Sequence, residues 1–247
     1  MHSCIACGGR ARLEKLEAGS RRCWLQALLA SRWPTTRCGT SVDEVCQASE
    51  EGSCGGEGLA RQHCLEAVTI AEIAAAARVA EMTVTNYFPR KEDLALDYHG
   101  TFTAGLARAV TCRAESESAL AALRRDFLAA LERHDAVAGF SGAEFARMVT
   151  DSPTLTARLR ELHDLREEAL ARALAAETAS SGGDLVPRAA AALLATAHRV
   201  LFQQVMDLTL AGRSNQEITA AVTRSAQEVF GLLEPSLGGY AVCRGRS

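Results

Sequence analysis

The chain has 247 residues, with 27 basic and 30 acidic side chains and a formal net charge of −3. No apolar run reaches the roughly 18 residues that a membrane-spanning helix needs, and no secretion signal is recognisable, so we expect a cytoplasmic protein without a membrane partner. Its 46 Ala, 25 Arg and only 4 Ile residues favour helix over strand, and an all-α fold is predicted. Because the overall charge is close to neutral, any affinity for nucleic acid has to come from a local patch.

Residues 1–58 differ in composition from the rest, being rich in Cys, Gly, Ser and Arg without a sustained helical or strand period. Two interpretations stay open: a poorly ordered extension, or an artefact of an incorrect start codon or reading frame. Seven of the nine cysteines lie before residue 65, and Cys4-x-x-Cys7 has the spacing of a zinc-ligand pair. No second close pair follows, so we expect reduced thiols, no metal site and no cofactor.

From about residue 59 the sequence predicts a series of helices. Two short ones, over 69–77 and 82–88, are separated by a four-residue break, and Pro89 precedes a longer helix over 91–112. Apolar spacing predicts further helices over 117–134, 142–150, 153–178, 187–211 and 215–233. We expect a linker over 180–184 and a loose tail from Pro235 onward.

The two short helices, their tight turn and the long helix after Pro89 form the pattern of a helix-turn-helix unit. In such a unit the second helix inserts its N-terminal residues into the major groove of DNA. Thr83, Thr85 and Asn86 could reach phosphates or base edges, and Tyr87 and Lys91 could contact flanking phosphates. The full set of predicted DNA-contacting residues is Thr69, Glu81, Met82, Thr83, Thr85, Asn86, Tyr87 and Lys91.

The stretch from Glu66 to Leu94 resembles the DNA-binding segment of TetR-family transcriptional regulators. The motifs that carry this resemblance are Val68-Thr-Ile70, Ile73-Ala-Ala-Ala-Ala77, Asn86-Tyr-Phe88 and Lys91-Glu-Asp-Leu94. The resemblance implies an extension over 1–44, a DNA-binding head over 45–95, a helical effector-binding and dimerisation domain over 96–234, and a tail over 235–247. It also implies a bacterial repressor, not an enzyme, that binds a palindromic double-stranded operator as a homodimer. A small lipophilic effector, with acyl-CoA-like molecules as one class, would release it.

Several residues differ from the family pattern and support an alternative. Ala80 stands where the family usually has a capping Ser or Thr, and Cys54-Gly-Gly-Glu-Gly58 falls within the expected first helix. Residues 66–94 hold three basic and five acidic side chains, which is a weak basis for attracting phosphates. The alternative is a helical ligand-binding dimer whose head no longer binds DNA.

A third hypothesis, an enzyme or a zinc protein, rests on weaker patterns. Gly139-Phe-Ser-Gly-Ala143 approximates a nucleophile elbow, but that motif follows a strand and has a second Gly where Ala143 stands. A helix is predicted before it here. We therefore interpret the segment as a turn between helices.

Aromatic, Met and basic residues on the later helices indicate an effector site, because ligand pockets are apolar with a few polar groups. The predicted ligand-binding residues are Phe127, Phe145, Met148, His163, Arg166, His198 and Phe202. Packing or surface positions are the alternative interpretation of these residues. The broad apolar faces of the last two helices predict a four-helix bundle between two copies. The predicted interface residues are Leu194, Leu201, Val205, Val222, Val229 and Phe230.

Overall fold

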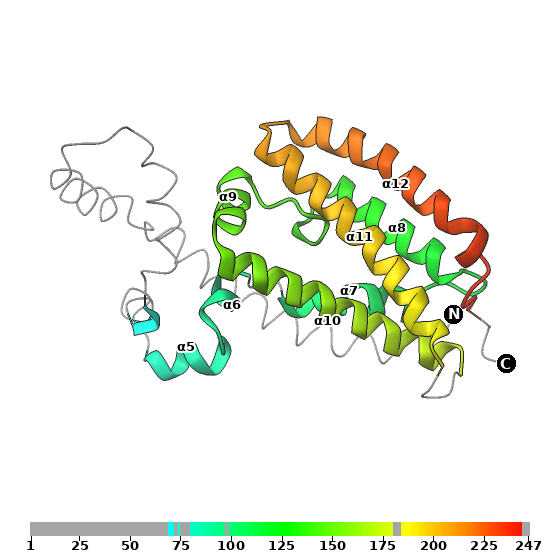
Figure 1. The fold of residues 1–247 in the computed structure, drawn as a ribbon, viewed down its shortest axis with the longest axis horizontal. Coiled ribbons are helices and arrows are strands. Elements are labelled where there is room, and N and C mark those ends of the chain that lie inside the picture. Colours follow the sequence, from blue (N-terminus) through cyan, green and yellow to red (C-terminus); the bar gives the residue numbers. More distant parts are fainter. Residues whose placement is uncertain (1–68, 72–73, 75–79, 97–98, 180–183, 244–247) are drawn as a thin grey trace, which may run out of the picture. The chain divides into compact units, whose positions relative to one another are not determined.

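The computed structural model describes residues 69–71, 74, 80–96, 99–179 and 184–243, and every regular element in these ranges is helical (Figure 1). The chain divides into two compact units between residues 97 and 98. The N-terminal extension and the predicted first helix of the head lie outside the described residues. Within the described ranges, no helix is long and apolar enough to cross a lipid bilayer.

The first unit contains α5 (Glu81–Tyr87) and α6 (Lys91–Ala95). Val84 and Phe88 are one helical turn apart, so both face the same side and are buried together with Ala74. Ile70 and Leu94 pack against this cluster from either end of the segment. A shared core of this kind holds two short helices together, as a helix-turn-helix requires.

The second unit is a helical bundle whose longest members are α10, α11 and α12. Its elements are α7 (His99–Thr111), α8 (Ala119–Glu132), the 3₁₀ helix η1 (Ala136–Ala138), α9 (Ala143–Asp151), α10 (Pro153–Glu177), α11 (Val186–Leu210) and α12 (Asn215–Leu237). Helix α10 packs against α7 and α11, α11 packs against α12, and α12 packs against α8 (Figure 1). One apolar core runs through these contacts.

Serine side chains fix the starts of three helices of the bundle. Ser118, Ser152 and Ser214 accept hydrogen bonds from the third residue of α8, α10 and α12 respectively. Pro153 follows Ser152 at the first helical position, where its missing N–H costs nothing. The predicted start of α10 at Ser152-Pro153 is therefore confirmed.

Two sequence-based boundaries are wrong. The single helix predicted over 91–112 ends at Ala95, because Leu96 leaves the helical conformation with φ −103° and ψ 47°, and α7 begins at His99. As far as residue 243, where the described part of the tail ends, the segment predicted to be loose from Pro235 is ordered, since α12 continues through Pro235 to Leu237. Beyond Leu237, Cys243 N–H donates to the Glu117 carbonyl at 3.1 Å, and Ser116 N–H donates to the Cys243 carbonyl at 3.0 Å.

The predicted dimer-interface residues lie in the core of a single chain. Leu194, Leu201, Val205, Val222 and Phe230 are buried, and Val229 packs against the same core. Because the five buried side chains already contact other helices of their own chain, they are not available to a second copy, whereas Val229 is half-buried and its place in an interface stays a prediction. The large apolar side chains that α11 and α12 expose are Val186 at the start of α11, and Leu193, Val200 and Leu232 further along.

Candidate DNA-binding and effector sites

Helix α5 has one buried face and one exposed face. Val84 and Phe88 face the small core, whereas Glu81, Met82, Thr85 and Asn86 are exposed, Met82 with 73% of its surface accessible. The exposed residues recur at helical spacing and so share one side of α5. Four of the eight predicted DNA-contacting residues are thus brought together on the helix that should enter the groove.

The remaining predicted residues are less uniformly placed. Thr69 is exposed, and Thr83 and Lys91 are half-buried. Tyr87 ends α5, but its side chain lies outside what the structure describes. Arg90, which sequence reasoning missed, is exposed directly after Pro89 and precedes α6 as its N-cap residue. The basic side chain of Arg90, placed between α5 and α6, was the signal in the sequence that could have identified this residue.

The N-terminus of α5 is uncapped by any side chain. Ala80 has the extended conformation of an N-cap residue, with φ −70° and ψ 141°, but contributes no side-chain hydrogen bond. Within the helix, the Thr85 hydroxyl donates to the carbonyls of Glu81 and Met82, at 3.3 and 3.1 Å. That proton is used inside the helix, so Thr85 can offer its methyl group and a remaining lone pair to a duplex.

A second candidate site lies inside the bundle, around Arg166 and His163 of α10. The Arg166 guanidinium carbon lies 4.4 Å from the centroid of the Phe102 ring of α7. Phe102 also packs edge-on against His163 and Phe202, with centroid distances of 5.0 and 5.8 Å. His163 and Phe202 are 5.4 Å apart. Three helices therefore contribute to one aromatic group beside the guanidinium.

His198 of α11 extends this group toward the centre of the bundle. Its ring packs edge-on against Phe127 of α8 at 5.3 Å and Phe230 of α12 at 5.5 Å. We name the set of Phe102, Phe127, His163, Arg166, His198, Phe202 and Phe230 the aromatic cluster; all seven are buried. Five of the seven predicted ligand-binding residues belong to it, and Phe102 is a member that the sequence analysis missed.

Phe145 and Met148 are placed differently. Both lie on α9 and are half-buried. Among the described residues, no ring contact joins Phe145 to the aromatic cluster. Their inclusion in an effector site remains a prediction.

Burial sets the protonation of the cluster. It lowers the pKa of His163 from 6.5 to about 4, with further lowering by the positive charges of Arg166 and Arg199. The pKa of His198 is also well below its usual value, first because of burial and then because of Arg166 and His163. Burial lowers the pKa of Arg166 to about 10, against the opposing effect of Asp126. At neutral pH the cluster therefore holds two neutral imidazoles and one cation.

Several polar atoms of the cluster lack hydrogen-bond partners. They are Nε of Arg166 and both ring nitrogens of His198. Buried polar atoms in native proteins are normally paired, so these exceptions mark polar groups that can still hydrogen bond.

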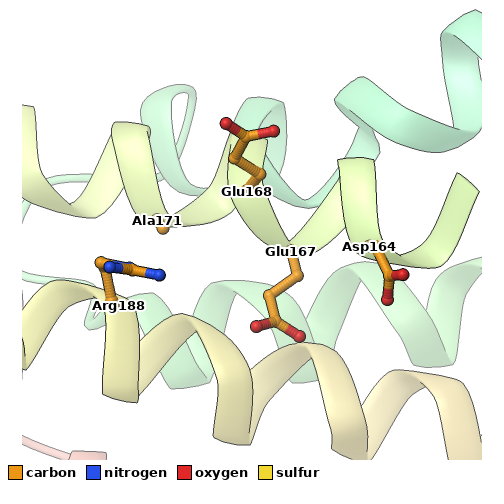
Figure 2. Close-up of a pocket in the computed structure, with 5 residues that line it drawn as sticks. All are labelled: Asp164, Glu167, Glu168, Ala171 and Arg188. Atoms are coloured by element: carbon orange, nitrogen blue, oxygen red, sulfur yellow. The ribbon is translucent and has the colours of Figure 1, made fainter. Parts of the chain in front are cut away.

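A separate surface pocket of about 200 Å³ lies between α10 and α11, lined by Asp164, Glu167, Glu168, Ala171 and Arg188. Figure 2 shows Glu167 and the Arg188 guanidinium extending into the space between the two helices, with Glu168 pointing away. Three carboxylates make this pocket unsuited to a lipophilic molecule. No group of His, Cys, Asp or Glu side chains in the described ranges is arranged to hold a metal ion.

The segment that approximates a nucleophile elbow connects η1 to α9. Gly139 follows η1 with φ 111°, and Gly142 is the N-cap residue of α9. The Ser141 hydroxyl lies 3.6 Å from Met206 Sδ. The interpretation as a turn between helices is confirmed.

Comparison with known proteins identifies the head. Residues 55–98 match the family model described as bacterial regulatory proteins of the tetR family. The matched segment includes α5 and α6, so the exposed face of α5 belongs to a TetR-type helix-turn-helix domain and the predicted resemblance is confirmed. A comparison with curated proteins gave no match.

Proposed function

We propose that this TetR-like transcriptional regulator is a repressor that binds a palindromic DNA operator as a homodimer and leaves it when an effector binds the helical unit. The observation that carries the proposal is the arrangement of α5 in the segment that matches the family. Val84 and Phe88 anchor the helix, and Glu81, Met82, Thr85 and Asn86 share its exposed side. A helix held in this way can present its N-terminal half to the major groove.

A homodimer gives this arrangement its operator geometry. Two recognition helices related by a two-fold axis bind half-sites roughly 34 Å apart, one helical turn of DNA. The effector acts as a switch if it binds one spacing of the two heads better than the other.

The exposed apolar side chains of α11 and α12 support such a dimer. Leu193 and Val200 are seven residues apart on α11 and each exposes 49% of its surface. Leu232 on α12 exposes 79%. Paired α11 and α12 helices from two copies would bury these side chains in a four-helix bundle.

The proposal is tested by selecting duplexes from a random library with the full chain and measuring their affinity at several salt concentrations. We expect an enriched palindrome. Asn86→Ala should change base preference and weaken binding about 5- to 150-fold, the equivalent of roughly 1–3 kcal/mol. Lys91→Ala should weaken all duplexes alike and reduce the salt slope by about 1. Arg188→Ala, which removes a cation from α11 in the other unit, is the control and should leave binding unchanged.

The alternative is a helical ligand-binding dimer that does not bind DNA. The observation in its favour is that residues 80–96 hold two basic side chains, Arg90 and Lys91, against three acidic ones. Absence of an enriched palindrome, together with no duplex binding at about 50 mM salt, where phosphate contacts are strong, would favour the alternative over the repressor.

A further inference from the structure

The aromatic cluster holds a cation without an anion. Arg166 is 4% exposed, and it forms no ion pair with a described carboxylate. We propose that the cluster binds the carboxylate of a small aromatic acid, with the anion on Arg166 and the ring among the phenylalanines. The inference rests on the proposed function, since this acid would be the effector of the regulator.

The charge of Arg166 is the first argument. A buried cation is normally paired, because removing it from water is costly and an adjacent anion offsets that cost. The carboxylate that stabilises its charged form is that of Asp126, which is exposed on α8 and forms no ion pair with it. A ligand carboxylate could accept two parallel hydrogen bonds from the planar guanidinium, the geometry that this side chain favours.

The histidines supply the second argument. Both nitrogens of His198 are buried and unpartnered, and Nε of Arg166 is unpartnered as well. Neutral imidazole has one N–H donor, so it can hydrogen bond to an anion without adding a second charge. Arg166 and the two neutral imidazoles together carry a single positive charge, which matches a monoanion.

The aromatic side chains around Arg166 indicate what kind of group carries the ligand's carboxylate. Phe102 and Phe202 are edge-on to His163, Phe127 is edge-on to His198, and the Phe102 ring lies against the guanidinium. An aromatic ring can pack edge-on or offset against such rings. A CoA group carries several phosphates and would need several cations, so the cluster favours a compact aromatic acid over an acyl-CoA-like molecule.

Gly105 of α7 lies beside the guanidinium, in van der Waals range of it. A Cβ at this position would lie 4.0 Å from Arg166 Nη2, and Gly105 itself is half-buried. One edge of the guanidinium therefore borders a half-buried position that has no side chain. This is the route by which we expect the acid to reach Arg166.

The test uses the full chain and compares 1-naphthoate with its neutral isostere 1-naphthamide by titration calorimetry. We expect the carboxylate to bind and the amide to bind at least tenfold more weakly. Arg166→Met should weaken naphthoate about 10- to 100-fold, as expected for the loss of a charge-assisted hydrogen-bond pair. Arg160→Met, which removes an exposed cation six residues earlier on α10, should leave affinity unchanged.

Folding of the variants does not confound the result. Removal of an unpaired buried charge should not lower the melting temperature, and Arg166→Lys keeps the charge without the planar fork. Equal affinity for naphthoate and naphthamide, or no binding of naphthoate by the unsubstituted chain, would overturn the proposal. Naphthoate binding that survives Arg166→Met would do the same.

The outcome is independent of DNA binding. A chain that binds naphthoate through Arg166 but has no operator supports the acid site and refutes the repressor. A chain that binds an operator but not naphthoate supports the regulator and refutes the acid site.

Discussion

Gly139 and Val205 approach so closely that a Cβ on Gly139 would lie 3.0 Å from the Cβ of Val205. The same added atom would lie 2.9 Å from the carbonyl oxygen of Phe202. Gly139 also has a φ of 111°, which side chains disfavour. The connection between η1 and α9 therefore rests directly on the turn of α11 that carries Phe202 of the aromatic cluster.

Gly139→Ala should destabilise the helical unit by about 2 to 4 kcal/mol, the sum of a positive-φ cost and overpacking. The measurement is the free energy of unfolding in urea. Gly212→Ala is the matched control, because Gly212 has φ 75° with no atom within 4 Å of the added Cβ. It should lose roughly 1 kcal/mol, the backbone cost alone. Equal losses at both positions would show that the close approach to α11 contributes nothing.

Arg113 should anchor the C-terminal segment. Its side chain donates to the carbonyls of Val110, Glu117 and Ala241 and forms an ion pair with Glu177 at 3.1 Å. Arg113→Met should cost about 3 kcal/mol, because it leaves these acceptors without their donor. We expect faster hydrogen exchange at the Cys243 amide in the same variant.

Glu177→Gln provides the control for Arg113. It removes the charge of the partner but keeps an acceptor, and Glu177 is 32% exposed, so the loss should be about 1 kcal/mol or less. Unchanged exchange at Cys243 in Arg113→Met would contradict the anchoring role.

His163 should make the fold sensitive to acid. Its pKa in the folded chain is about 4, against 6.5 ordinarily, because of burial and the charges of Arg166 and Arg199. Between these pH values the unfolded chain binds a proton that the folded chain does not, so stability falls as the pH drops through this window. His163→Phe keeps a ring beside Phe102 and Phe202. It should reduce the acid-dependent decrease in the free energy of unfolding by up to about 3 kcal/mol.

Urea unfolding at several pH values between 4 and 7.5 measures the effect. Some acid sensitivity should remain, because the pKa of His198 is also lowered. His134→Asn is the control, since His134 is exposed and its φ of 51° suits Asn. A His163→Phe profile that parallels the unsubstituted chain would exclude His163 as the source.

Local signals in the sequence were sufficient to predict the helices of the bundle, but not the tertiary contacts between them. Ser152-Pro153 marks the start of α10 because a cap and a first-turn proline act on adjacent backbone. Pro235, by contrast, led to the wrong prediction that the helix ends there. It lies inside α12, where tertiary contacts of the following residues hold the chain in place. The change of conformation at Leu96 has no comparable mark in the sequence.

The two candidate sites also differ in how far the sequence alone could predict them. The α5 residues followed from the helix-turn-helix pattern of one short segment, and the structure places Val84 and Phe88 on the buried side of that helix. The aromatic cluster needs Phe102 of α7 beside Arg166 of α10, and no periodicity within one helix relates them. Periodicity also cannot distinguish a core face from an interface, which is why Leu194 and Phe230 were assigned to a dimer surface.

Ala80→Ser should strengthen the head. Ala80 already has N-cap dihedral angles, and a Ser hydroxyl there could accept a hydrogen bond from the first turn of α5. The expected gain is about 1 kcal/mol, seen as slower hydrogen exchange in α5 and tighter operator binding. Ala80→Val, which adds bulk without an acceptor, should give no gain.

Leu193→Glu combined with Val200→Glu should convert the proposed dimer to a monomer. Both side chains are half exposed on one side of α11, so Glu is tolerated in a free chain, but two copies would bury unpaired charges there. Light scattering after size-exclusion chromatography at micromolar concentration gives the mass directly.

The control for this pair is Leu165→Glu, because Leu165 is 40% exposed on α10 rather than on α11 or α12. It should keep the dimeric mass, and the double variant should bind a palindromic operator no more tightly than a single half-site. A dimeric mass for the double variant would place the contact between copies on another surface. Because two linked heads bind one operator cooperatively, a monomer that still prefers the palindrome would also contradict dimerisation as the basis of its recognition.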